Sequence, residues 1–181
     1  MESLAVGGIG FVMILLYDVA QINERNGFAW ALSYIGYGAV LASIVFPLAH
    51  LRPAESPRTA LVILGAIAVL GFALLVYSVL IEIPLALKKS RRTSSGRRQV
   101  VAVGTYSGVR HPGFLWFALC LSALALLYRQ RAMTEIAAGL ILFDFLLVVI
   151  EDLVLFPRIF QDYEQYKKNV PFLVPRFARR K

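Results

Sequence analysis

Four acidic residues lie in long apolar stretches of the chain, where a charged side chain is costly: Glu82, Asp144, Glu151 and Asp152. Asp144 and Glu151 are seven residues apart, about two helical turns, so on a helix they share one face. We expect that face to turn toward other helices. The adjacent acids Glu151 and Asp152 predict a cationic partner, and the candidates are Arg110, His111 or a positively charged ligand.

The other two acids have simpler structural explanations. Glu82 is expected to extend to the membrane interface and pair with Lys88 or Lys89. Asp144 is as compatible with a neutral, hydrogen-bonded acid joining two helices as with a functional group. The two histidines, His50 and His111, are far apart in the sequence and predict no metal site.

The composition decides which elements position these groups. The chain has 181 residues, of which 59% are hydrophobic and 17% charged, compared with about 45–50% and about 25% in soluble domains. This excludes a soluble globular enzyme and a disordered chain. The single cysteine excludes an internal disulfide framework.

The sequence therefore predicts an all-α fold, a polytopic membrane bundle of about five transmembrane helices followed by a cytoplasmic helical tail. A helix needs about 20 apolar residues to cross a bilayer. Five stretches reach or approach that length: Leu4–Ala20, Phe28–Leu51, Thr59–Leu87, Pro112–Leu127 and Thr134–Phe156. Pro112 suits the first turn of its helix.

The basic residues predict the orientation. With five spans, 15 of the 19 Lys and Arg residues fall on one side, mainly in the loop 88–111 and in the tail after residue 156. The positive-inside rule then places that loop, the site and the C-terminus in the cytoplasm and the N-terminus outside. The basic run 88–98 is interpreted as a topology anchor that attracts the lipid bilayer, and no nucleic-acid partner is expected.

Two motifs in the second half of the chain carry a family resemblance. The stretch from Gly104 to Phe114 reads GTYSGVRHPGF; further on, the acids at 151–152 are followed by Tyr163 and Tyr166 and then by a Val-Pro step at 170–171. In order and spacing, both resemble the motifs of isoprenylcysteine carboxyl methyltransferase-like membrane enzymes, and phospholipid methyltransferases share the pattern. The resemblance covers roughly residues 100–177. It divides the chain into an N-terminal membrane part (1–99) and a methyltransferase-like, cofactor-binding part (100–181).

The resemblance implies an integral membrane methyltransferase that uses S-adenosylmethionine and a lipophilic or lipidated acceptor. Arg110 and Glu151 are the implied catalytic residues. The implied cofactor-binding residues are Gly104, Tyr106, His111, Pro112, Glu151, Asp152, Tyr163 and Tyr166. Independently of the resemblance, acids beside a cytoplasmic opening suit a cytosolic, cationic sulfonium.

The chain departs from the family pattern mainly on the acceptor side. Phe114 replaces a tyrosine, Trp116 replaces a small residue, and Phe172 replaces an arginine, so that Arg176 is the remaining candidate for an acceptor carboxylate. Phe114, Trp116 and Arg176 are therefore the expected substrate-binding residues. Within the acidic pair, Asp152 stands where glutamate is usual.

Two other classes of function compete with this interpretation. One is a membrane reductase resembling the steroid-reductase group, which would use NADPH. The other is a non-catalytic relative that binds lipid or a partner. The sequence does not choose among acceptors: prenylated cysteine, a phospholipid amine, a quinone-like lipid and a small thiol all fit.

Overall fold

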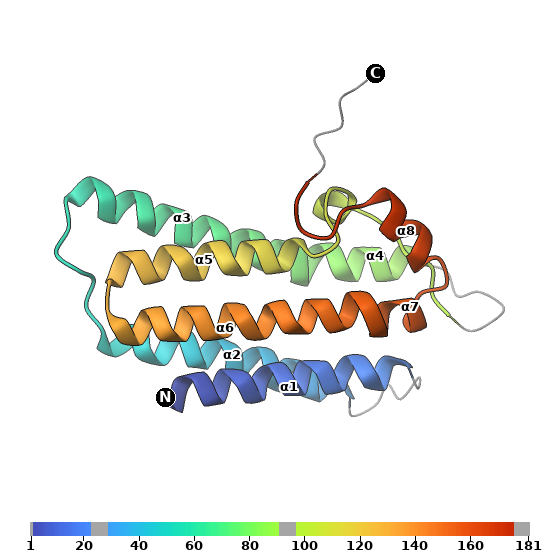
Figure 1. The fold of residues 1–181 in the computed structure, drawn as a ribbon, viewed down its shortest axis with the longest axis horizontal. Coiled ribbons are helices and arrows are strands. Elements are labelled where there is room, and N and C mark those ends of the chain that lie inside the picture. Colours follow the sequence, from blue (N-terminus) through green and yellow to red (C-terminus); the bar gives the residue numbers. More distant parts are fainter. Residues whose placement is uncertain (1, 23–28, 91–96, 176–181) are drawn as a thin grey trace, which may run out of the picture.

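The chain folds into long helices that lie side by side (Figure 1). The computed structural model describes residues 2–22, 29–90 and 97–175. Within these ranges the regular structure is helical, apart from one isolated parallel bridge between Arg98 and Phe160. The elements are α1 (Glu2–Ile22), α2 (Ala29–His50), α3 (Arg58–Tyr77), η1 (Ser78–Glu82), α4 (Ile83–Lys89), η2 (Gly104–Ser107), α5 (Pro112–Tyr128), α6 (Arg131–Ile150), η3 (Glu151–Leu155), α7 (Phe156–Ile159) and α8 (Tyr163–Asn169).

The all-helical prediction is confirmed, and each of the five predicted stretches is a helix. By length and composition, three described helices could cross a membrane: α1, α2 and the continuous segment Arg58–Lys89, which contains α3, η1 and α4. Helix α5 is apolar but shorter, with 17 residues. The surface of α3 carries exposed Val62, Ile63 and Val69. Such a contiguous apolar surface favours contact with lipid.

The helices form a bundle in which α1 packs on α2 and α6, α6 packs on α5, and α5 packs on α3 (Figure 1). The core between them is aliphatic and includes Leu121, Met133 and Leu140. Helices α1 and α2 approach closely at Gly10 and Gly36, where a Cβ added to either residue would lie under 3.0 Å from the carbonyl oxygen of the other. Small residues permit this contact.

Two π-helical turns, η1 and η3, interrupt the long helices. In η1 the N–H of Ile83 donates to the carbonyl of Ser78, and in η3 the N–H of Phe156 donates to the carbonyl of Glu151. Such turns add one residue to the helix and are frequent at functional sites. Three of the four acids singled out from the sequence lie in these two turns: Glu82 in η1, Glu151 and Asp152 in η3.

The elements that follow these turns gather at one end of the bundle. Helices α4, α7 and α8 lie there, opposite the start of α1 (Figure 1). The segment that precedes α5 joins this end through hydrogen bonds to α7 and to the residues after α8. The two sequence motifs therefore meet in space.

Candidate functional site

The centre of the site is a buried ion pair between Arg110, just before α5, and Asp152, in η3. Arg110 Nη2 donates a hydrogen bond to Asp152 Oδ2 at 3.1 Å. Arg110 Nε lies 2.8 Å from Asp152 Oδ1, a contact between charges in which the N–H bond does not meet hydrogen-bond geometry. The side chains are 10% and 6% exposed. The prediction that the acidic pair has a cationic partner is thus met by Arg110 for Asp152.

Arg110 also fixes the C-terminal segment. Its Nη1 donates to the carbonyls of Lys167 and Val170, each at 3.2 Å, and its backbone N–H donates to the carbonyl of Pro171 at 2.9 Å. A guanidinium that binds one carboxylate and two carbonyls uses most of its donors. Arg110 therefore holds the end of α8 against the start of α5.

His111 lies between the two acids of η3. Its Nε2 is 3.4 Å from Asp152 Oδ1, and its Nδ1 is 3.6 Å from Glu151 Oε2. The ring stacks on Phe156 and meets the edge of Phe172. Burial lowers the pKa of His111, although the nearby Asp152 acts in the opposite direction.

Phe172, one of the departures from the family pattern, contacts the site directly. Its ring centroid lies 5.2 Å from the ring of His111 and 5.6 Å from the guanidinium carbon of Arg110. An arginine here would place a second cation beside Arg110. Phe172 instead covers both side chains with an apolar surface.

Three tyrosines close the site: Tyr106 from η2, and Tyr163 and Tyr166 from α8. Tyr163 donates its hydroxyl to Asp152 Oδ1 at 2.7 Å, and Tyr166 donates to the carbonyl of Tyr106 at 2.6 Å. Burial raises the pKa of Tyr163 and Tyr106 above the usual range for tyrosine, and it raises that of Tyr166 to about 12. All three are therefore neutral phenols at physiological pH. They can donate hydrogen bonds but do not act as bases.

Glu82 positions the loop that carries Gly104 and Tyr106. Its Oε1 accepts a hydrogen bond from the N–H of Thr105 at 2.9 Å, and its Oε2 accepts one from the Thr105 hydroxyl. Glu82 is 2% exposed. The expectation that it extends to the interface and pairs with Lys88 or Lys89 is wrong, because the carboxylate turns inward and caps η2.

Gly104 is required by this contact. Its φ is +50°, and a Cβ at this position would lie 1.6 Å from Glu82 Oε1. No residue with a side chain fits beside the carboxylate. Gly104 therefore shapes the loop, and the glycine of the first motif has a steric explanation.

One acid of the site was missed by the sequence reasoning. Asp18, near the end of α1, shares a side-chain hydrogen bond with Glu151. Asp144, one of the acids singled out from the sequence, lies within electrostatic reach of the same carboxyl group. Asp18 carried the same signal as the others, an acid at the end of an apolar stretch, but nothing in the sequence paired α1 with η3.

Two of the predicted substrate-binding residues, Phe114 and Trp116, make no hydrogen bond, ion pair or ring contact with the described side chains of this centre. The Phe114 ring packs on Phe145 of α6, with centroids 5.8 Å apart. Trp116 lies further along α5, and its indole Nε1 is buried without a hydrogen-bond partner among the described residues. Arg176 lies outside the described residues. Pro112 is buried and begins α5, as predicted.

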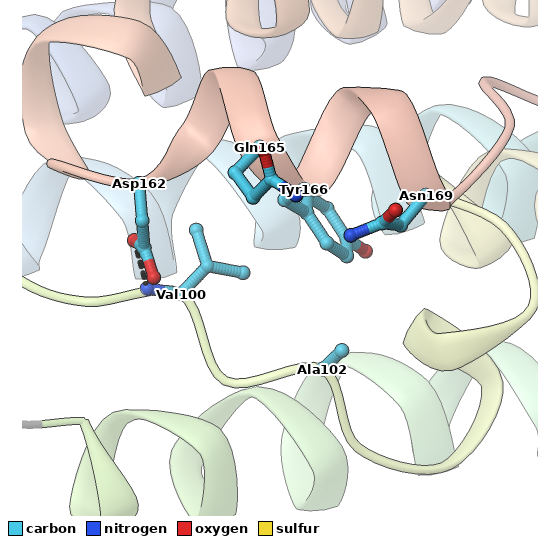
Figure 2. A pocket seen from close by; sticks show the side chains of 6 residues that line it. All are labelled: Val100, Ala102, Asp162, Gln165, Tyr166 and Asn169. Atoms are coloured by element: carbon cyan, nitrogen blue, oxygen red, sulfur yellow. Dashed lines mark hydrogen bonds between the residues drawn. The ribbon is translucent and has the colours of Figure 1, made fainter.

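An open pocket of about 190 Å³ lies beside Tyr166, between α8 and the segment that precedes η2 (Figure 2). Val100 and Ala102 form one wall, and α8 and the residue before it contribute Asp162, Gln165, Tyr166 and Asn169. Asp162 accepts a hydrogen bond from the N–H of Val100 at 2.8 Å, which ties the two walls together. The described residues contain no group of three His, Cys, Asp or Glu side chains that could hold a metal ion.

Comparisons with known proteins return nothing for this chain: no family model, no curated protein and no solved structure matches it. The function of this chain is therefore inferred from its residues and their geometry.

Proposed function

We propose that this protein is an integral membrane methyltransferase that uses S-adenosylmethionine and acts on a lipid-like or membrane-embedded acceptor. The observation that carries the proposal is the convergence of Tyr106, His111, Glu151 and Tyr163 on one cluster at one end of the bundle. These residues come from separate segments of the chain and belong to the two sequence motifs.

The distribution of charge supports a cationic ligand. Arg110 balances the charge of Asp152, but the groups nearest Glu151 include the further acids Asp18 and Asp144. Acidic groups that lack a matching cation stabilise a positively charged neighbour. Asp18 Oδ2 is shielded from solvent and has no hydrogen-bond donor among the described residues. This half of the cluster fits a sulfonium.

Bound S-adenosylmethionine would supply an electrophilic methyl group, which passes to the acceptor as the carbon–sulfur bond breaks. The protein's part is alignment and exclusion of water. Glu151 and His111 would hold the polar part of the donor, and Tyr163 and Tyr166 would close over it. The phenols and the histidine are neutral, so a carboxyl or thiol acceptor would arrive already ionised.

The pocket in Figure 2 would bind the nucleoside end of the donor. At about 190 Å³ it is smaller than the roughly 300–1,000 Å³ of sites that enclose a whole ligand. It would therefore accept one part of the donor. The amides of Gln165 and Asn169 could hydrogen-bond to a base or ribose.

The proposal includes five membrane crossings with the site in the cytoplasm. Helices α5 and α6 lie beside the longer apolar helices and extend along the same axis (Figure 1). The 15 basic residues of loop 88–111, the tail and position 25 would then share the cytoplasmic side, although positions 25, 91, 92 and 176–181 lie outside the described residues. The acceptor would enter laterally from the lipid.

The reductase alternative needs cations for the phosphates of NADPH. Arg110, the arginine at the centre of the site, is already bound to Asp152. This favours the methyl donor over the dinucleotide. The non-catalytic alternative predicts that neither ligand binds.

The test is binding of S-adenosylmethionine and of NADPH, measured side by side by calorimetry on the purified protein in detergent. We expect the methyl donor alone to bind. Binding of NADPH alone would replace the proposal with the reductase. Binding of neither, to a sample shown to be folded by circular dichroism, would favour the non-catalytic relative.

A further inference from the structure

Asp18 contacts the site from the N-terminal part of the chain. It lies in the last turn and a half of α1, which packs against both η3 and α7. Its side chain shares a hydrogen bond with Glu151, and its Oδ2 is buried. Helix α1 thus contributes a functional group to a cluster that is otherwise built from residues after 100.

A hydrogen bond between two carboxyl groups has a chemical requirement. An ionised carboxylate only accepts hydrogen bonds, so one of the two partners must carry a proton. Two ionised carboxylates that lie next to each other in a buried site would also repel each other strongly. The pair formed by Asp18 and Glu151 therefore holds one proton and one negative charge.

The position of the hydrogen on the His111 ring is consistent with a single shared proton between Asp18 and Glu151. Asp152 is ionised through its contact with Arg110, so the His111 Nε2 that faces it is the nitrogen that carries hydrogen. A neutral imidazole then presents a bare Nδ1 toward Glu151. Glu151 is therefore held between Asp18 on one side and His111 on the other.

The charge of this pair depends on the groups that surround it in the described part of the chain. The titratable and charged groups that face it from neighbouring elements are Tyr17 of α1, Tyr37 of α2, Tyr106 of η2, His111, Asp144 of α6 and Asp152 of η3. Among the described residues, Arg98 is a cation of this region, and it acts on Tyr17. Acids and neutral phenols dominate this set.

We propose that Asp18 is a positioning residue, which holds Glu151 through a shared proton and sets the charge that this cluster presents to a ligand. This inference rests in part on the proposed function, because the ligand it serves is the cationic methyl donor. When the donor binds, its positive charge favours ionisation of both carboxyl groups, and the shared proton passes in part to water.

The first test needs no ligand. Infrared spectra of the detergent-solubilised protein would report the carbonyl stretch of a protonated carboxyl group. We expect Asp18→Asn and Glu151→Gln each to remove the same band, since either amide can donate to the remaining carboxylate in place of the proton. The control Asp144→Asn should leave that band in place, because Asp144 contacts the cluster only electrostatically. If the band that Asp144→Asn leaves in place persists in Asp18→Asn, the proposal is overturned.

The second test measures proton release on donor binding, by calorimetry in two buffers of different ionisation enthalpy. The wild type should release part of a proton, and Asp18→Asn should release almost none, because the shared proton is absent in that variant. Asp18→Leu cannot hold Glu151, and it should bind about tenfold more weakly. Equal affinity in the Asn and Leu variants would contradict a positioning role. If the wild type binds no donor, the proposed function fails, and the shared proton is decided by the infrared test alone.

Discussion

Glu82 and Glu151 occupy similar places and have different environments. Each is a glutamate in a π-helical turn of a long apolar helix, and each is largely buried. Both oxygens of Glu82 accept hydrogen bonds from Thr105. Glu151 instead faces Asp18 and a histidine nitrogen at 3.6 Å. A buried acid in an apolar helix is therefore not by itself a sign of chemistry, because the partners that satisfy its charge decide its role.

The largest effect on stability should come from a substitution of Asp152, the other acid of η3. Like Glu82, Asp152 has a carboxylate whose oxygens are bound by neighbouring groups. Asp152→Ala leaves the Arg110 guanidinium buried without its carboxylate. Breaking a buried ion pair costs about 3–5 kcal/mol. We expect thermal unfolding in detergent, followed by circular dichroism, to shift strongly downward. Glu135→Ala, which removes the exposed ion pair with Arg131, is the control and should leave thermal unfolding almost unchanged. Equal shifts in both variants would mean that the Arg110 pair does not hold the tail.

The next largest effect tests the role of Glu82, the acid of η1, in holding the loop at Gly104. Gly104→Ala forces a Cβ into Glu82 at a backbone conformation with positive φ, which should cost about 2–3 kcal/mol. Gly108→Ala is the matched control, because its Cβ would meet only the Thr105 carbonyl at 3.6 Å. Chemical denaturation would give both values. A neutral Gly104→Ala would show that Glu82 does not hold the loop in this way.

A smaller effect separates charged from neutral hydrogen bonds at the site. Tyr163→Phe removes a donor from the Asp152 carboxylate, which should cost about 1.5–3 kcal/mol, whereas Tyr166→Phe removes a donor from the Tyr106 carbonyl and should cost about 1 kcal/mol. The free energy of unfolding of the two variants, measured under one condition, tests this order. The reverse order would mean that the Arg110 contact alone satisfies Asp152.

The smallest expected effect is a pH dependence from His111, whose pKa is lowered by burial. Above about pH 6.5 the histidine is neutral in both the folded and the unfolded chain and contributes nothing. As the pH falls below 6.5, the unfolded chain takes up a proton that the folded chain does not, so stability falls until the folded pKa is reached. The slope for a single proton is at most about 1.4 kcal/mol per pH unit.

The variant His111→Asn should lose this component between pH 7 and pH 5. Subtracting its free energy of unfolding from that of the wild type at each pH isolates the histidine from the carboxylates that titrate in the same range. A difference that does not change with pH would contradict the burial of a neutral imidazole.

Much of the fold was accessible from the sequence, because apolar stretches between charged segments form helices at nearly the expected limits. Pro112 at the start of α5 is one such boundary. The partners of the acids were harder to predict. Hydropathy gives helices but not their neighbours, so the contact of Asp18 with η3 and the capping of η2 by Glu82 had no signal in one sequence.

The candidate site, like the fold, could be predicted only in part from the sequence. The family resemblance implied that the residues of the two motifs form one site. They do lie close together, because His111 and Asp152 are at the ends of helices that pack side by side. The sequence named Arg110 as one candidate partner of the acidic pair, but it did not predict that Arg110 also binds the carbonyls of Lys167 and Val170. That arrangement depends on how the tail folds back, which is a tertiary contact.

The central claim is that Glu151 serves a ligand and Glu82 serves the fold. The direct test compares S-adenosylmethionine affinity in Glu151→Gln and Glu82→Gln by calorimetry, since each amide keeps the shape of the side chain and removes its negative charge. We predict that Glu151→Gln binds at least about tenfold more weakly than the wild type, whereas Glu82→Gln stays within about threefold. Unchanged affinity in Glu151→Gln, or an equal loss in both variants, would contradict the account.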